Sequence, residues 1–203
     1  LARLATREFG YNAAELVRIV DEVRAAVSAT APASPPLAVL EVGCYAGRTT
    51  RALLTATPGL VISIDPLDRN RAMPRWPAPD GVWIETRRHM EALLAERGGG
   101  RLIVLPCFAE EVFDLVRPPL AALVIDTEHS YEPQVRQIDA WAPLVRDGGV
   151  IVFDDFDMEP VASAWRDCEY RRARQWLTCE TFESLGIVRV APQPRPVAQE
   201  AEQ

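Results

Sequence analysis

The sequence predicts a single α/β domain in which helices cover both faces of a doubly wound, mostly parallel β-sheet. Three observations carry this prediction. A chain of 203 residues has the length of one domain. Short apolar runs alternate with segments of helical periodicity, an order that builds parallel sheets through right-handed crossovers. Most of these runs are almost wholly apolar, which is typical of strands buried on both faces.

The first half of the chain is predicted to contain two helices and two strands. Leu16, Val20, Val23 and Val27 repeat at helical spacing within residues 13–28, which predicts an amphipathic helix. The proline-containing stretch TAPASPP ends this helix and forms a stiff linker. The elements that follow are a strand over residues 37–42, a helix over 48–57 and a strand over 60–64.

The second half repeats this alternation and then closes the sheet. Three prolines in residues 71–80 predict a loop, and paired glycines at 148–149 are expected to end the helix over 133–145. In chain order, we expect helices over residues 87–97, 109–116, 133–145 and 160–174 and strands over 102–105, 121–125 and 150–153. Two last runs, 175–182 and 186–190, flank a turn signal and predict a β-hairpin.

We expect residues 1–191 to form the domain, with residues 1–30 as an N-terminal helical segment. Residues 192–203 are rich in Pro, Gln and Glu and are expected to be a disordered tail. No domain linker or internal repeat is visible in the sequence. The organisation is therefore that of one functional unit.

Composition excludes several classes of protein. A formal net charge of −7 argues against a nucleic-acid surface, which must neutralise phosphates. The apolar runs are far shorter than the ~20 residues that a membrane span needs, and no cationic start with an apolar stretch indicates a secretion signal. Four irregularly spaced cysteines and two histidines argue against a tetrahedral zinc site. We therefore expect a cytoplasmic protein with reduced cysteines and no membrane partner, and leave open whether it forms a homo-oligomer.

Acidic side chains stand at or just past the carboxyl ends of four of the predicted strands. Because ligands of such sheets bind at the carboxyl ends of the strands, these residues are candidates for a functional site. The set consists of Glu41, Asp65, Asp126, Asp154 and Asp155, together with His129. A single acid at a strand end can simply face solvent, but a whole set beside a glycine turn indicates a ligand site.

The turn after the first strand, GCYAG at residues 43–47, predicts a cofactor that carries a nucleoside. Its glycines let the backbone pass close to a ligand before a helix begins. Asp65 lies 18 residues after Gly47 and can accept hydrogen bonds from both hydroxyls of a ribose. The dinucleotide pattern G-x-G-x-x-G is not met, because Tyr45 stands two residues after Gly43. The turn therefore favours a cofactor without a pyrophosphate.

Two stretches of the sequence resemble a known family. The segment VLEVGCYAGRTTRAL, followed by VISIDP, resembles the class I S-adenosylmethionine (SAM)-dependent methyltransferases over residues ~37–190. The segment ALVIDTEHSYEPQVRQIDAWAPLVRDGGVIVFDDF is similar to metal-dependent O-methyltransferases, and especially to the macrocin-type sugar methyltransferases of natural-product pathways. The resemblance implies a Rossmann-like fold with seven strands and a closing antiparallel hairpin. It also implies methylation of a small-molecule hydroxyl.

The resemblance implies a SAM site at the glycine turn. Gly43 and Gly47 would line the methionine part, Thr49 would lie near its carboxylate, and Asp65 would bind the ribose. The further cofactor-binding residues that it implies are Glu41, Cys44, Tyr45 and Phe108. One departure follows the third strand, where the family often has Gly-Asp-Ser and this chain has Cys-Phe-Ala at 107–109. An aromatic ring, rather than an acid, is then available to cover the adenine.

The resemblance also implies a metal and a base. Asp126, Asp154 and Asp155 match the metal-ligand positions of the family, and carboxylates suit a hard cation such as Mg²⁺. His129 matches the general base and acts beside Asp126. Relatives of the catechol type use lysine there, but this chain contains no lysine. Imidazole, with an ordinary pKa of about 6.5, can accept a hydroxyl proton near neutral pH.

Other interpretations remain open at this point. Proteins of the cephalosporin hydroxylase type resemble the same subfamily and carry out other chemistry, and a SAM-binding protein without turnover is a second alternative. His129 could be a turn residue, and Asp154 and Asp155 could cap the next helix. The acceptor pocket would be built by the N-terminal helix, residues 66–80 and residues 156–160. Residues expected to have only structural roles are His89, Trp141 and Trp165.

Overall fold

The elements alternate along the chain as the sequence predicts. The computed structural model describes residues 12–30, 37–67, 80–97 and 100–192. In chain order the elements of the first half are α1 (Ala13–Thr30), β1 (Ala38–Val42), α2 (Arg48–Ala56), β2 (Val61–Ile64), α4 (Asp80–Arg97) and β3 (Leu102–Leu105). Those of the second half are a 3₁₀ turn at Ala109–Glu111, β4 (Leu120–Ile125), α5 (Tyr131–Trp141), a 3₁₀ turn at Ala142–Leu144, β5 (Val145–Phe153), α6 (Glu159–Asp167), α7 (Glu169–Ala173), β6 (Glu180–Phe182) and β7 (Leu185–Arg189).

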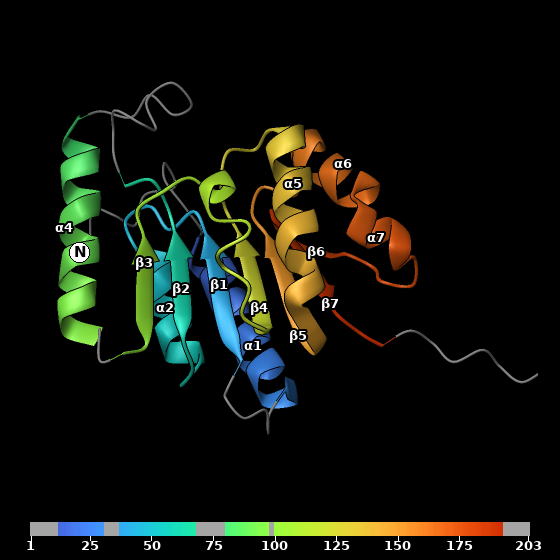
Figure 1. The fold of residues 1–203 in the computed structure, drawn as a ribbon, viewed down its shortest axis with the longest axis horizontal. Helices are drawn as coiled ribbons and strands as arrows, with labels where there is room; N and C mark the ends of the chain where they lie inside the picture. Colours follow the sequence, from blue (N-terminus) through green and yellow to red (C-terminus); the bar gives the residue numbers. More distant parts are fainter. Residues whose placement is uncertain (1–11, 31–36, 68–79, 98–99, 193–203) are drawn as a thin grey trace, which may run out of the picture.

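The strands form one seven-stranded sheet in the order β3-β2-β1-β4-β5-β7-β6. The pairs from β3 to β5 are parallel, while β7 runs antiparallel to both β5 and β6. The predicted doubly wound sheet with a closing antiparallel hairpin is thereby confirmed (Figure 1). The strand order reverses between β1 and β4, which is where ligands of doubly wound sheets bind.

Helices pack on both faces of this sheet. The cluster of buried residues on one face combines strand residues with Ile19 of α1, Leu53 of α2 and Met90 of α4. The cluster on the other face includes the predicted core residues Trp141 of α5 and Trp165 of α6. In β1, β2, β4 and β5, successive side chains alternate between the two clusters. Burial on both faces explains why these strands read as continuous apolar runs.

The glycine pair at 148–149 lies inside a strand, which corrects the prediction that it ends a helix. Helix α5 ends at Trp141, and β5 begins at Val145 and contains both glycines. A Cβ atom on Gly149 would lie 2.7 Å from the carbonyl oxygen of Ala121 in the neighbouring strand. The glycine is therefore required by close backbone packing in the sheet.

Two predicted helices are shorter or divided in the structure. The helix expected over 109–116 is reduced to the 3₁₀ turn Ala109–Glu111. The helix expected over 160–174 is split at Cys168, whose extended backbone separates α6 from α7. The thiol of Cys168 is buried and its sulfur accepts a hydrogen bond from the N–H of Arg171, so it caps α7.

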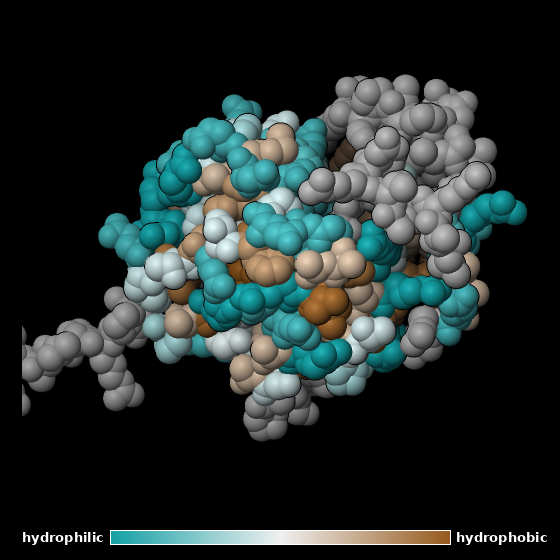
Figure 2. All heavy atoms as spheres, turned by 180° about the vertical axis from the view of Figure 1, so that it is seen from behind, coloured by the Kyte–Doolittle hydropathy of each residue, from teal (hydrophilic) through white to brown (hydrophobic). Residues whose placement is uncertain are grey.

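Some predictions concern residues beyond the described ranges. The linker at 31–36, residues 71–79 of the predicted loop and the tail from 193 fall there, and residue 80 opens α4. On the face opposite to that of Figure 1, hydrophilic residues surround separate apolar ones over the described part of the chain (Figure 2). None of the described helices has the length and apolar character needed to cross a membrane.

Candidate active site

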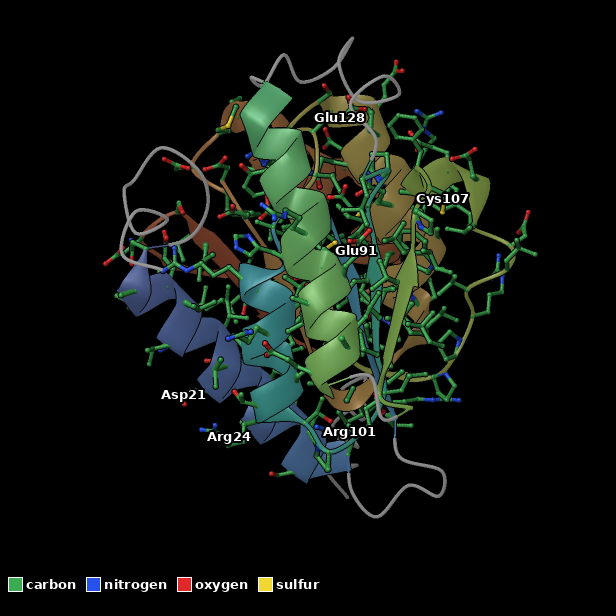
Figure 3. All side chains as sticks on the ribbon, turned by 90° about the vertical axis from the view of Figure 1, so that its left-hand side faces the viewer. Asp21, Arg24, Glu91, Arg101, Cys107 and Glu128 are labelled. Atoms are coloured by element: carbon green, nitrogen blue, oxygen red, sulfur yellow. The ribbon has the colours of Figure 1, made fainter. Side chains whose placement is uncertain are left out.

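The carboxyl ends of the parallel strands form one continuous edge that carries the predicted site residues. The hydrogen-bond ladder of the sheet continues past the end of four strands and fixes the residue that follows each one. Its N–H···O distances are 2.8 Å from Gly43 to Ile64, 3.1 Å from Asp65 to Leu105, 2.8 Å from Asp126 to Val42 and 3.0 Å from Asp154 to Ile125. Figure 3 shows Glu128 at this end of the molecule and Arg101, which precedes β3, at the opposite end.

The glycine turn approaches the end of β4 very closely. Gly43 has φ +87°, and a Cβ atom there would lie 1.6 Å from the backbone oxygen of Asp126. Tyr45 and Gly47 also have positive φ, 41° and 72°. The turn therefore folds back over the sheet edge between β1 and β4, where only a glycine fits at its first position.

Asp65 holds this turn in place. Its Oδ2 accepts hydrogen bonds from the N–H groups of Cys44 at 3.1 Å and Tyr45 at 2.9 Å. Its Oδ1 accepts one from the N–H of Leu67 at 2.9 Å. Burial raises the pKa of Asp65, and these three N–H groups partly offset the effect. Sequence reasoning gave Asp65 a ligand role and missed this structural one.

Glu41 is a fully buried carboxyl group beneath the turn. Its Oε2 accepts hydrogen bonds from the hydroxyl groups of Thr50 and Ser63, both at 2.6 Å. Its Oε1 has no hydrogen-bond partner among the described residues. Burial raises the pKa of Glu41 to about 7, against the lowering effect of the two hydroxyl groups. Thr50 was not among the predicted residues, and it is buried in the first turn of α2 beside Thr49, the residue predicted to lie near the methionine carboxylate.

A second cluster combines Asp126, His129, Asp154 and Asp155. One ligand atom from each of Asp126, His129 and Asp154 lies within 4.8 Å of the others, a grouping that could hold a metal ion. The Nδ1 atom of His129 lies 3.4 Å from Oδ2 of Asp155, and its Nε2 lies 3.9 Å from Oδ1 of Asp126. This Nε2 is buried and has no hydrogen-bond partner in the part of the chain that the structure describes.

The acids of this cluster repel one another. Burial and the charges of Asp154 and Asp155 raise the pKa of Asp126 well above its ordinary value. Burial and the charge of Asp155 also raise the pKa of Asp154 to about 7. Neighbouring carboxylates that resist joint ionisation are a setting in which a cation binds favourably.

The loop that carries His129 is held by buried glutamines that sequence reasoning missed. The hydroxyl of Thr127 donates to Oε1 of Gln137 at 3.0 Å, and Nε2 of Gln134 donates to the backbone oxygen of Glu128 at 3.4 Å. Both glutamines are at most 3% exposed. The sequence signal that could have indicated them is the position of both glutamines beside the apolar face of the helix predicted over residues 133–145.

The predicted residues thus fall into two adjoining groups. Glu41, Cys44, Tyr45 and Asp65 belong to the turn, and the histidine and aspartates follow β4 and β5. The two groups meet where Gly43 contacts the backbone of Asp126. Phe108 is half-buried and follows β3, with its N–H donating to Glu111 Oε2 at 2.7 Å. A glycine turn beside an acid–histidine cluster, on a doubly wound sheet with a closing hairpin, is the arrangement that the sequence resemblance to methyltransferases implied.

Comparison with known proteins supports this class. A family profile described as "Methyltransferase domain" matches residues 40–156, which is more than half of the chain. The chain therefore belongs to this methyltransferase family, and the resemblance seen in the sequence is confirmed. No significant match was found among curated protein sequences.

Solved structures of O-methyltransferases share the fold. The O-methyltransferase NovP superposes with a TM-score of 0.69 at 20% identity, covering 89% of this chain and 81% of its own. CalS11, a TDP-rhamnose 3′-O-methyltransferase of calicheamicin biosynthesis, has a TM-score of 0.62 at 15% identity and coverages of 93% and 83%. TomG of Streptomyces achromogenes, an O-methyltransferase of tomaymycin synthesis solved with SAM, has a TM-score of 0.62 at 15% identity and coverages of 94% and 86%.

Proposed function

We propose that this protein transfers the methyl group of SAM to a hydroxyl group of a small molecule, with the help of a divalent cation. The observation that supports this most is the contact between Gly43 and the backbone of Asp126, because it joins the cofactor turn to the acid–histidine cluster. A donor held on the turn and an acceptor held at the cluster would be neighbours. The names of CalS11 and TomG, enzymes of calicheamicin biosynthesis and tomaymycin synthesis, support a natural-product intermediate as the acceptor.

The residues of the turn fit SAM. Gly43 and Gly47 let the turn keep positive φ while it packs closely against Asp126 and Met90, and Glu41 keeps one buried oxygen without a described partner. Oδ1 of Asp65 accepts a single N–H and retains the capacity to accept a ribose hydroxyl. The remaining residues that we assign to this cofactor site are Cys44, Tyr45, Thr49 and Phe108.

The acid cluster fits a hard cation such as Mg²⁺. Asp126 and Asp154 would supply carboxylate oxygens, and their raised pKa values mean that a cation would relieve their mutual repulsion. Asp155 completes the set of acids, with its carboxylate directed at His129. When bound, the cation would lower the pKa of the acceptor hydroxyl and fix its orientation.

His129 would remove the proton of the acceptor hydroxyl. Oδ2 of Asp155 lies 3.4 Å from Nδ1, and a ring proton held on Nδ1 toward this carboxylate would leave Nε2 as the proton acceptor. Nε2 is the buried atom without a described partner, so it is available for a substrate hydroxyl. The oxygen left by this proton transfer is the nucleophile for the methyl group.

Binding calorimetry and labelled SAM test this function together. We expect the protein to bind S-adenosylhomocysteine and Mg²⁺, and to transfer labelled methyl to vicinal diols of the sugar or catechol type only when the cation is present. Asp154→Asn should lose Mg²⁺ binding and turnover but keep S-adenosylhomocysteine binding. Full turnover in excess chelator would contradict the role of the cation. Failure of the wild type to bind S-adenosylhomocysteine would contradict the proposed class of reaction.

A further inference from the structure

The first turn of α1 is closed by a capping box. The Oδ1 atom of Asn12 accepts hydrogen bonds from the N–H groups of Ala14 at 2.8 Å and Glu15 at 3.0 Å. In return, Oε2 of Glu15 accepts one from the N–H of Asn12 at 2.8 Å. Capping glutamates are ordinarily exposed, but Glu15 is only 5% exposed. The burial of Glu15 indicates that its carboxylate also binds groups outside helix α1.

The other oxygen of Glu15 holds the turn between β6 and β7. Oε1 accepts hydrogen bonds from both the hydroxyl and the N–H of Ser184, the latter at 3.3 Å. The adjacent residue of this turn, Glu183, has φ +52° and accepts a hydrogen bond from the side chain of Asn12. Residues 169 positions apart in the chain are thus tied together at a buried carboxylate.

The same turn holds the residue that follows Asp155. The backbone oxygen of Ser184 accepts a hydrogen bond from the N–H of Phe156 at 2.6 Å. The ring of Phe156 lies against Gly186 of β7, where an added Cβ atom would come within 2.4 Å of the ring. The centroid of the Phe156 ring lies 5.8 Å from that of Phe153. Phe156 is therefore fixed through both its backbone and its side chain.

Asp155 is the residue that this anchoring constrains. Its φ of +48° is a left-handed conformation that is uncommon for residues with a side chain, although aspartate tolerates it better than most. Phe156 is held on one side of it, and on the other the N–H of Asp154 is bonded to the end of β4. The backbone conformation held in this way directs the carboxylate of Asp155 toward Nδ1 of His129.

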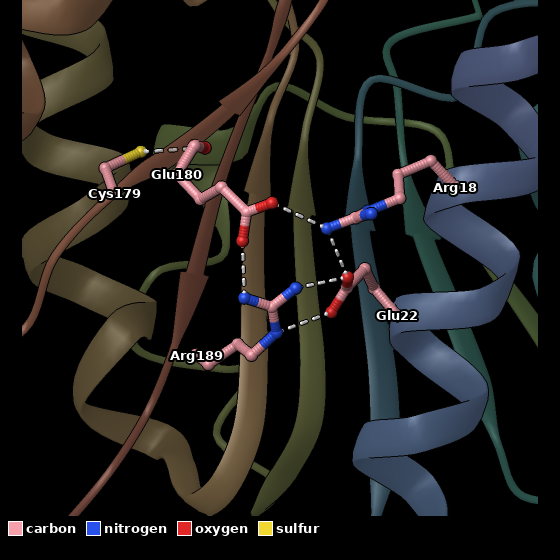
Figure 4. A network of polar contacts seen from close by, with 5 residues as sticks. All are labelled: Arg18, Glu22, Cys179, Glu180 and Arg189. Carbon is pink, nitrogen blue, oxygen red and sulfur yellow. Dashed lines mark hydrogen bonds and ion pairs between the residues drawn. The ribbon is translucent and has the colours of Figure 1, made fainter.

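The attachment of α1 to the hairpin does not depend on Glu15. A separate network of four charged residues joins the same two elements farther along (Figure 4). Its N···O distances are 2.9 Å between Arg18 and both Glu22 and Glu180, 2.6 Å between Arg189 and Glu22, and 2.7 Å between Arg189 and Glu180. The contact of Glu15 with Ser184 is the one that continues to the site.

We propose that Glu15 and Ser184 are positioning residues, which hold the turn at Asp155 and thereby orient the His129–Asp155 pair. The inference rests on the proposed function of that pair. It assigns the start of the N-terminal helix and the tip of the closing hairpin to the support of the active site. Direct hydrogen-bond partners of metal ligands commonly change metal affinity about 10–100-fold, and because Glu15 and Ser184 act one step farther out, we expect effects at the lower end of that range.

The test uses Mn²⁺ alone as the probe, measured by calorimetry on the full chain. We expect Glu15→Ala and Ser184→Ala each to weaken Mn²⁺ binding about tenfold, with no further loss in the double variant, because both act through one contact. Ser184→Thr keeps the hydroxyl and should restore the affinity. Glu180→Gln breaks the neighbouring network and should leave Mn²⁺ affinity within about twofold, even if it lowers the melting temperature. S-adenosylhomocysteine affinity should be unchanged in all of them.

Three results would overturn the inference or separate it from the proposed function. Wild-type Mn²⁺ affinity in Ser184→Ala and Glu15→Ala overturns it, and so does an equal loss of S-adenosylhomocysteine affinity, which would mean general damage to the sheet edge. If the wild type binds no Mn²⁺, the metal role in the proposed function fails. The positioning role is then tested by amide hydrogen exchange of residues 154–158. Faster exchange in both variants, but not in Glu180→Gln, then supports the positioning role, and equal rates overturn it.

Discussion

Gly43 is the residue on which the two halves of the site meet. Alanine at this position would bring Cβ to 1.6 Å from the oxygen of Asp126 while φ is +87°. We expect Gly43→Ala to lower the free energy of unfolding by roughly 3 kcal/mol or more and to abolish S-adenosylhomocysteine binding. Gly100→Ala is the control, because Gly100 has φ +81° but nothing within 4 Å of its Cβ position. That variant should cost only about 1–2 kcal/mol, and equal losses in chemical denaturation would contradict the close contact.

Glu41 should make the protein less stable as the pH rises. Its pKa is about 7 when folded and 4.5 in its ordinary state, so the folded protein holds a proton that the unfolded chain releases. The contribution of the protonated Glu41 to the free energy of unfolding, roughly 3 kcal/mol, is fully present below pH 4.5 and is lost as the pH rises to about 7. Urea denaturation of Glu41→Gln should show a shallower decline over this range. Glu132→Gln, at an exposed position of α5, should follow the wild-type curve.

His129 should affect turnover far more than cofactor binding. We expect His129→Ala to reduce the rate of methyl transfer ~10²–10⁴-fold, because no other described imidazole lies in the acid cluster. His89→Ala is the matched control, since His89 is exposed on α4. Single-turnover rates and S-adenosylhomocysteine affinities of both variants provide the measurement. A His129→Ala enzyme with the wild-type rate would make this histidine a turn residue only.

Site residues could be predicted from the sequence only where the strand order alone brings them together in the fold. The acids after β1, β2, β4 and β5 were predictable, because parallel strands end at the same edge. The partner of Glu41 was not, since Thr49 and Thr50 are adjacent and only the rotation of α2 places Thr50 on the carboxylate. Glu15 and Ser184 could not be found either, because no local pattern connects the two ends of the chain.

At the scale of elements, Gly149 separates two interpretations of the segment after α5. If the glycine ended a helix, alanine would be tolerated or favourable. In β5, however, a Cβ atom at Gly149 would lie 2.6 Å from a methyl of Val145 and 2.7 Å from the oxygen of Ala121. We expect Gly149→Ala to destabilise the protein by about 1–3 kcal/mol in thermal denaturation. A neutral or stabilising effect would mean that the strand begins later than Val145.

The bounds of the first four strands were predicted closely. The apolar run at 102–105 gave the bounds of β3, and those of β1, β2 and β4 differ from prediction by one residue at one end, whereas β5 begins five residues before its predicted run and β6 begins five residues after. Burial on both faces makes such runs unambiguous. The break between α6 and α7 at Cys168 is not marked by a glycine or proline in the sequence. It depends instead on a buried thiol that caps α7. Helical periodicity continues across it.

For the whole molecule, the class of the sheet was predicted from the sequence and the attachment of α1 was not. The alternation of apolar runs and helical segments predicted the parallel part, and the last two runs predicted the closing hairpin. An amphipathic stripe shows only that α1 packs on something. The buried Glu15 and the charged network of Arg18, Glu22, Glu180 and Arg189 bring it to the hairpin, beside the site. The acceptor pocket, which we expect to involve this helix, is consequently the least predictable part.

SAM and a divalent cation should bind side by side along the edge from β2 to β5. A crystal structure of the protein grown with S-adenosylhomocysteine and Mg²⁺ tests this most directly. We predict S-adenosylhomocysteine against the turn at residues 43–47 with its ribose at Asp65, and Mg²⁺ at the carboxylates of Asp126 and Asp154. Electron density for S-adenosylhomocysteine away from this turn, or an acid cluster that binds no cation at saturating Mg²⁺, would contradict it.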